Sequence, residues 1–387
     1  EASAFNKDIG TWDVSKVTSM VDMFRKAAAF NNGGTDGIKA WKTGLVTDMA
    51  YMFYRAAFNQ AIPKNGDKWD TAKVTDMEGM FYEASAFNKD IGTWDVSKVT
   101  SMEGMFQGAK KFNQELKDWD TTAVKNMKNM FNGAVAFNQE LKPDTKKWVT
   151  IAVTSMEGMF QGATKFNNGD KDTIKNWDTT ALTNSKNMFN GAEAFNQPIP
   201  YATPKWKTTA VTDMEGMFQG AKIFNQELKT WDTKAVKNMK NMFKGAVAFN
   251  KELAGTSPAW DLSAVETMEG MFEGATKFNN DDKDTMKTWI TSAVTNMASM
   301  FKGAADFNLD LTQAGGKWDT GEVTTMQNMF NGAAKFDKDL TSWKTKLAKV
   351  TNNVDMWTGA SAMTSGKKPC TTPATTATNV NWPACPA

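Results

Sequence analysis

The chain has 387 residues, with 45 Lys and Arg against 43 Asp and Glu, and it contains no histidine. A formal net charge of +2 gives no field that would attract nucleic acid, and no apolar run is long enough to span a bilayer. Without histidine, imidazole acid–base catalysis, Ser-His-Asp and Cys-His nucleophiles and the usual zinc sites are excluded.

The opening stretch EASAFNKDIGTWDVSKVTSM recurs unchanged from Glu83 to Met102. A Met-Phe pair returns at steps of 25 to 29 residues, its Phe falling at 24, 53, 81, 106, 131, 160, 189, 218, 243, 272, 301 and 330. A degenerate thirteenth copy ends in Met356-Trp357. A Trp precedes each of those twelve Phe residues by twelve positions, whereas the Phe-Asn pair precedes the Trp by either seven or eleven. A constant segment with one variable corner is typical of a solenoid, whose packed layers must match while one corner can bulge.

The unusual abundance of Trp and Met follows this repeat, which predicts a continuous stacked core and not a cofactor site. The residues that we assign to this core are Trp12, Trp94, Trp119, Trp148, Met127, Met130 and Phe131.

Each unit has a pattern that predicts a helix. Between residues 126 and 138 the apolar side chains Met127, Met130, Phe131, Ala134 and Phe137 follow the spacing of one helical face. The residue before the first Met is a helix N-cap type in every unit. The preceding segment, residues 121–124, is prone to extended structure and predicts a short parallel strand. The fold class is therefore expected to be an α/β solenoid resembling leucine-rich repeats, with about 13 units of one strand and one helix each.

Two further columns are expected along the stack. The Asn after the closing Phe, Asn138 and its equivalents, either caps the helix or bonds the backbone of the next coil. The residue after the first Met alternates in charge through seven units, from Glu103 and Lys128 to Glu269, so oppositely charged side chains would lie beside each other and fix the register.

The repeats extend over residues 1–360, and residues 361–387 form a Thr/Pro-rich cap or linker. This segment contains both cysteines of the chain, Cys370 and Cys385, for which we predict a local disulfide and an oxidising compartment. Whether its Thr-rich run is glycosylated stays open.

Calcium is the one cofactor that the sequence leaves open. The acidic corners NNGDKD and NNDDKD supply Asp170, Asp172, Asp282 and Asp284 as oxygen ligands for a hard cation, although their spacing does not match an EF-hand. Solvated loops explain the same residues.

The repeat F-N-x-x-[IL]-x-x-W-[DK]-x-S-x-V-T-x-M-x-x-M-F resembles the BspA-like leucine-rich-type surface repeats, known from mycoplasma proteins of unknown function. The resemblance covers residues 1 to about 360. It implies a leucine-rich-repeat-like solenoid, an extracellular or cell-surface location, and adhesion or binding of an extracellular protein or glycan. The family has no shared catalytic residues to transfer, and the binding residues stay unknown.

Three functions fit these observations. The first is a non-enzymatic surface protein that binds another macromolecule, since solenoids present long regular faces. The second is a fibre subunit that assembles head to tail, because Glu1 corresponds to Glu83 in mid-unit and a second molecule would complete that layer. The third is binding to ice or a crystal surface by the Thr that follows the repeat Val, as at Thr18, Thr47 and Thr75. An enzyme is not expected, because the carboxylates recur with the repeat and a catalytic site is normally unique.

Overall fold

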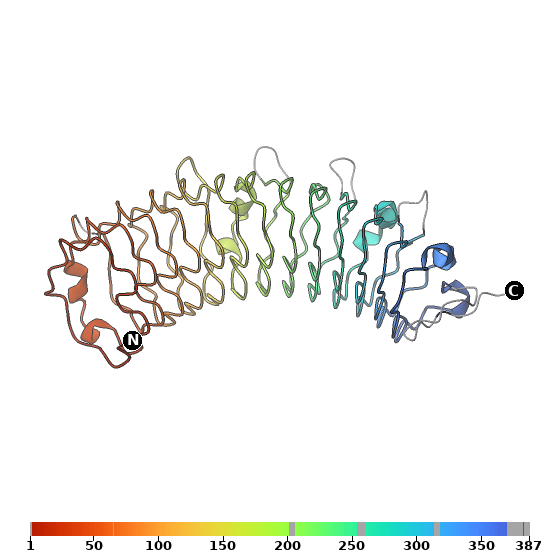
Figure 1. Ribbon diagram of the computed structural model, residues 1–387, viewed down its shortest axis with the longest axis horizontal. Coiled ribbons are helices and arrows are strands. Elements are labelled where there is room, and N and C mark those ends of the chain that lie inside the picture. The colour runs from red at the N-terminus through yellow and green to blue at the C-terminus, as the bar shows by residue number, and fades with distance from the viewer. Residues whose placement is uncertain are drawn as a thin grey trace. The chain divides into compact units, whose positions relative to one another are not determined.

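The computed structural model describes residues 2–64, 66–200, 206–253, 260–312, 318–369 and 382. They form two units, of which the first contains the described residues up to Pro198 together with Trp206, and the second contains residues 199–200 and those from Lys207 onward. In each unit successive coils lie side by side in chain order (Figure 1). The expectation of a repeat solenoid is therefore confirmed within each unit.

Alternate backbone N–H groups hold neighbouring coils together. In the coil that follows Trp119, the N–H groups of Met127, Asn129, Phe131 and Gly133 donate to carbonyl groups of the next coil at 2.6–3.1 Å. The N–H groups between them close turns inside the coil, for example Met130 N to Met127 O at 3.2 Å. Every donor in this segment is thus satisfied either along the stack or within a turn, as buried backbone requires.

The predicted helix is wrong. Residues 126–138 form consecutive turns, and the structure describes no α-helix in the ranges given above. Two positions per coil have left-handed backbone, Asn129 at φ 54° and Gly133 at φ 69° in this coil. A left-handed third residue is what a type II turn requires and what an α-helix excludes. The apolar spacing predicts a helix incorrectly here, because consecutive turns of four residues also place side chains on one side every three or four positions.

The predicted strand also lies elsewhere. Residues 121–124 form a turn closed by Val124 N and Thr121 O at 3.0 Å. The parallel pairing occurs immediately after it, as one-residue bridges such as Ser101 with Asn126 and Asn126 with Ser155. The residue expected to cap a helix is therefore the residue that bridges neighbouring coils.

Short 3-10 helices are the only helices among the described residues, and they lie mainly in corners of eleven residues. Three such corners contain two helices each, namely η1 (Asn32–Gly34) with η2 (Gly37–Ala40), η3 (Asn168–Asp170) with η4 (Asp172–Asn176), and η5 (Asn280–Asp282) with η6 (Asp284–Thr288). The helices η8 (Thr341–Lys346) and η9 (Ser365–Lys367) follow near the end of the second unit. In each double-helix corner a buried Asn (Asn32, Asn168 or Asn280) accepts a hydrogen bond from the N–H of a buried Ile or Leu in the preceding coil. This contact holds the corner against its neighbour.

The core consists of stacked aromatic rings. Within one coil Phe131 and Phe137 stack with centroids 4.0 Å apart, and Phe131 lies 5.5 Å from Phe106 in the preceding coil. The indole N–H of Trp119 donates to the carbonyl of Ile91 at 3.2 Å, and that of Trp148 donates to the carbonyl of Leu116 at 2.7 Å. Burying one such ring stabilises the fold by about 1.5–3 kcal/mol, and stacking adds about 0.5–1.5 kcal/mol.

The expected core residues Trp94, Trp119, Trp148, Met127, Met130 and Phe131 are all buried. Trp12 is the exception, because its side chain is 51% exposed. It lies in the first of the described coils. The assignment of Trp12 to the core is therefore wrong.

The Asn column bonds successive coils and caps no helix. The Oδ1 of Asn113 accepts the backbone N–H of Asn138 at 2.8 Å, and the Oδ1 of Asn138 accepts that of Asn167 at 2.7 Å. The same bond recurs in the second unit, from Asn225 to Asn250 and onward to Asp337.

The charge column forms within each unit. Lys128 Nζ lies 3.5 Å from Glu157, and Lys240 Nζ lies 2.9 Å from Glu269. The carboxylate of Glu157 also accepts the side-chain amide of Asn184 at 3.2 Å. These pairs are part-exposed, so they contribute to register more than to stability.

Candidate functional site

The first unit has an open depression of about 810 Å³ at its variable corners. It occurs where two successive corners are short, between Phe87 and Trp94 and between Phe112 and Trp119. The corners on either side have the longer spacing, Phe58 to Trp69 and Phe137 to Trp148. The two short corners protrude less than the long corners on either side, which we call low and tall. The depression that they leave is called the notch.

Polar side chains from three corners line the notch, together with Gly92 and the buried Trp94. They are Asp90, Thr93, Asn113, Gln114, Glu115, Lys117, Asp118 and Gln139. The two short corners approach closely at Gly92, where a β-carbon would lie 2.8 Å from the carbonyl oxygen of Glu115. Glycine is therefore required at this contact.

Hydrogen bonds fix the amide side chains of the notch. Gln114 donates its amide N–H to the Asn88 side chain at 2.8 Å, and Gln139 donates to the Asn113 side chain at 3.1 Å. Both amides thus extend the Asn column toward the notch, and their Oε1 atoms remain as acceptors with a fixed orientation.

Two ion pairs involve charged side chains of the notch. The Lys147 ammonium lies 2.5 Å from Asp118 and holds the pKa of that carboxyl below its usual value. Glu115 lies 2.6 Å from Lys117 and raises the pKa of that ammonium by its hydrogen bond. All four side chains are 46–62% exposed, so the solvent screens both pairs.

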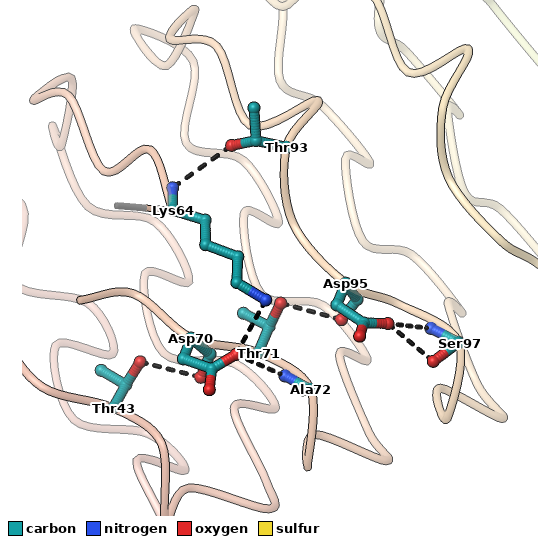
Figure 2. Close-up of polar contacts among 8 residues, drawn as sticks. All are labelled: Thr43, Lys64, Asp70, Thr71, Ala72, Thr93, Asp95 and Ser97. Atoms are coloured by element: carbon teal, nitrogen blue, oxygen red, sulfur yellow. Dashed lines mark hydrogen bonds and ion pairs between the residues drawn. The ribbon is translucent and has the colours of Figure 1, made fainter. Parts of the chain in front are cut away.

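A polar network supports the wall of the notch at Thr93 (Figure 2). The backbone N–H of Lys64 donates to the Thr93 hydroxyl at 3.2 Å, and the Lys64 ammonium lies 3.1 Å from Asp70. The chain around Asp70 is fixed in turn, because the Thr43 hydroxyl donates to the Asp70 carbonyl at 3.0 Å. The tall corner before the notch is thereby tied to the low one.

The next coil repeats this arrangement. The Thr71 hydroxyl donates to the Asp95 carbonyl at 2.8 Å (Figure 2). The hydroxyl of Ser97 and then its backbone N–H donate to the Asp95 carboxylate at 2.6 and 3.0 Å, and these bonds lower the pKa of Asp95. The turn that follows Trp94 is therefore stabilised by the ionised carboxylate of Asp95.

The calcium candidates do not converge on one site. Asp170 and Asp282 each accept the side-chain amide of the Asn three residues before, at 2.8 and 2.7 Å. Asp172 pairs with Lys175 at 2.5 Å, and Asp284 accepts the backbone N–H of Asp310 at 3.1 Å. Across the described ranges no three His, Cys, Asp or Glu residues gather as a metal site. The predicted disulfide of Cys370 and Cys385 lies outside the described residues.

The sequence contains the signal for the notch, although we made no prediction there. Two successive spacings of seven residues between longer ones mark it in the first unit. The lining itself repeats the corner motif N-Q-E-L-K, and only the position of that motif between tall corners makes it a depression.

A family model described as "Mycoplasma protein of unknown function, DUF285" matches the chain at residues 1–65, 57–169, 140–256, 202–285 and 256–368. The chain belongs to this family. The match confirms the resemblance to the mycoplasma repeats, and its segments cover nearly the whole repeat region.

No curated protein matches the chain. A solved leucine-rich repeat protein from Bacteroides ovatus ATCC 8483 is similar at 11% identity and a TM-score of 0.35, covering 77% of this chain and 73% of that one. Within the described residues, no helix has the length and apolar character needed to cross a membrane.

Proposed function

We propose that this chain is a non-enzymatic repeat protein of the cell surface or extracellular space that binds another macromolecule, a glycan or a protein, at the notch. The observation that carries the proposal is the notch itself, an irregular polar depression in a regular stack. Its volume lies within the range of ligand sites, about 300–1,000 Å³.

The lining chemistry favours a ligand rich in hydroxyl groups. Carboxylates and amide oxygens accept hydrogen bonds from neighbouring hydroxyls, and a carboxylate can accept two at once. Asp90, Glu115 and Asp118 provide the carboxylates, while Gln114 and Gln139 provide the fixed amide oxygens. A glycan chain is thus the preferred ligand, and a protein loop is the alternative.

A corner exchange tests the proposal. Residues 114–118, QELKD, are replaced by QELKPDTKK, the sequence that the next coil uses at 139–147. The exchange fills the notch with a corner that the fold already accepts. The matched control is the same exchange at residues 226–230, QELKT, in the second unit.

The chain and both variants are applied to an array of neutral and acidic oligosaccharides and to immobilised extracellular matrix proteins. We expect the unmodified chain and the control to bind and the 114–118 exchange to lose binding. Absence of binding by the unmodified chain, or equal binding by all three, would refute the proposal.

Binding to ice or a crystal surface is a second candidate, and the exposed Thr column favours it. Thr18, Thr47, Thr75 and Thr100 are all exposed on successive coils. The hydroxyl of Thr47 donates to the carbonyl of Thr18 at 3.2 Å, and Thr75 repeats this bond to Thr47. Their spacing is therefore regular, and Lys125 interrupts the column. Inhibition of ice recrystallisation by the chain, lost on replacing Thr75 and Thr100 with Lys, is the test.

Head-to-tail assembly is the third candidate. Each coil bonds its two neighbours through different groups, since Met127 N–H donates to the next coil and Lys125 N–H to the preceding one, so every coil-to-coil contact is heterologous and could propagate. Light scattering that shows open-ended growth with concentration would support a fibre, and a discrete species would oppose it.

A further inference from the structure

The first three coils carry a part-exposed cluster of residue types that the following coils lack at the same positions. It contains both arginines of the chain, Arg25 and Arg55, with three of the four tyrosines, Tyr51, Tyr54 and Tyr82. We call these five residues the tyrosine–arginine patch. At the positions of Arg25, Tyr54 and Tyr82 the following coils have Gln107, Asn132, Gln161 and Asn190.

The patch is a connected surface with internal order. Tyr54 and Tyr82 stack with centroids 4.6 Å apart. The Arg25 guanidinium lies 4.7 Å from the centre of the Tyr54 ring, and that of Arg55 lies 5.2 Å from it. Gln107 donates its amide N–H to the Tyr82 hydroxyl at 3.4 Å, so this row of contacting side chains ends on the fourth coil.

The backbone shows that two of the patch residues, Tyr51 and Arg55, are kept against conformational preference. Ten coils have glycine at the second left-handed position, from Gly108 at φ 70° to Gly359 at φ 76°. The first three coils instead have Lys26, Arg55 and Glu83 there, with φ between 51° and 56°. Tyr51 is also left-handed, at φ 56°. Strained residues that cluster on one surface point to function, since a simple repeat would have glycine.

The neighbouring coil is adapted to the patch. The Tyr51 ring lies over Gly79, where a β-carbon would be 2.4 Å from two ring carbons. The Tyr51 hydroxyl donates to Glu78, and Arg55 holds Glu83 with two hydrogen bonds at 2.7 and 3.1 Å. The side chains of Arg25, Arg55 and Glu83 remain 40–47% exposed.

Charge along the patch changes sign from coil to coil. The first coil contributes Arg25 and Lys26 against Asp22, and the second contributes Arg55. The third coil contributes Glu78 and Glu83 to the patch, and the fourth adds Glu103. One end is therefore basic and the other acidic, and a copy turned by a half rotation about Tyr54 places the basic coil of each chain against the acidic coil of the other.

We infer that the tyrosine–arginine patch is an isologous dimer interface, occupied by the same patch of a second copy in antiparallel orientation. Tyr and Arg are the residues that most often dominate protein interfaces. Both faces of the Tyr54 ring are already engaged, by Arg25 and by Tyr82, so it is not an open platform for a sugar ring. Four coils make a small interface, so the dimer is reversible, with a dissociation constant on the order of micromolar. The notch lies on later coils and plays no part in this inference.

The test measures the mass of the full chain by sedimentation equilibrium and light scattering over a concentration range around that constant. The first variant combines Tyr54→Gln and Tyr82→Asn, which are residues that later coils use in the same column. It should fold as well as the unmodified chain and dimerise at least about tenfold more weakly. The matched control is Gln161→Asn in the same column outside the patch, and it should leave the dimer unchanged.

A charge exchange tests the orientation. Arg25→Glu and Glu83→Arg each place like charges together in the antiparallel dimer, so each variant alone should be monomeric. Mixed one to one, they restore both pairs, and a mixed dimer should form. A monomeric unmodified chain throughout the range, a dimer insensitive to the tyrosine variant, or a mixture that stays monomeric would each overturn the inference.

Discussion

Replacing Gly133 with alanine distinguishes the observed turns from the helix that the apolar spacing predicts. Gly133 has φ 69°, and an added β-carbon would lie 3.6 Å from the nearest atoms of Gly108, an ordinary contact. The cost is therefore conformational, about 1–2 kcal/mol for an L-residue in left-handed backbone. In a helix the same change would stabilise the protein by about 0.8–1 kcal/mol, so the two structures predict opposite signs.

Thermal unfolding followed by tryptophan fluorescence measures the sign. For a unit of this size we expect Gly133→Ala to lower the midpoint by about 2–8 °C. Ser299→Gly is the reciprocal control, because it relieves a left-handed serine at φ 57° at a position where another coil has Gly270, and it removes only a hydroxymethyl group. Its midpoint should rise. A higher midpoint for Gly133→Ala would refute the tandem-turn structure of the coil.

Three further predictions follow from individual contacts. Asn113→Ala removes the acceptor of the Asn138 N–H and of the Gln139 amide and should cost about 1–3 kcal/mol in denaturant unfolding, whereas Asn113→Asp keeps the acceptor and should cost less. Trp119→Phe leaves the Ile91 carbonyl without its indole donor and should lower the free energy of unfolding by about 1–3 kcal/mol. Trp12→Phe, at the exposed indole, should change it by no more than about 0.5 kcal/mol, and equal losses would contradict the difference in burial. The pKa of Asp95 is lowered in the folded protein, so its contribution to the free energy of unfolding is present above the ordinary value of 3.8 and is lost as the pH falls through the lower folded value. Asp95→Asn should therefore reduce the difference in urea midpoint between neutral and acidic solution. An unchanged difference would reject this role.

The sequence by itself determined the repeat, the constant distance from Trp to Phe, and the burial of Trp119, Met127 and Phe131. These features are readable because identical coils must place identical apolar side chains in one stacked core. It also contained the turn signal, since Gly or Asn recurs at positions such as Asn129 and Gly133, where a helix would disfavour both.

Only the tertiary structure decided which backbone satisfied that pattern. Apolar spacing of three and four residues fits a helix and a series of turns equally, and the choice depends on where the N–H groups go. In the segment from Met127 to Gly133 every second N–H donates to a carbonyl of the next coil, and a local sequence pattern cannot predict that contact. The notch and the tyrosine–arginine patch likewise arise from side chains about 25–29 residues apart in the chain, and they become neighbours only when the coils stack.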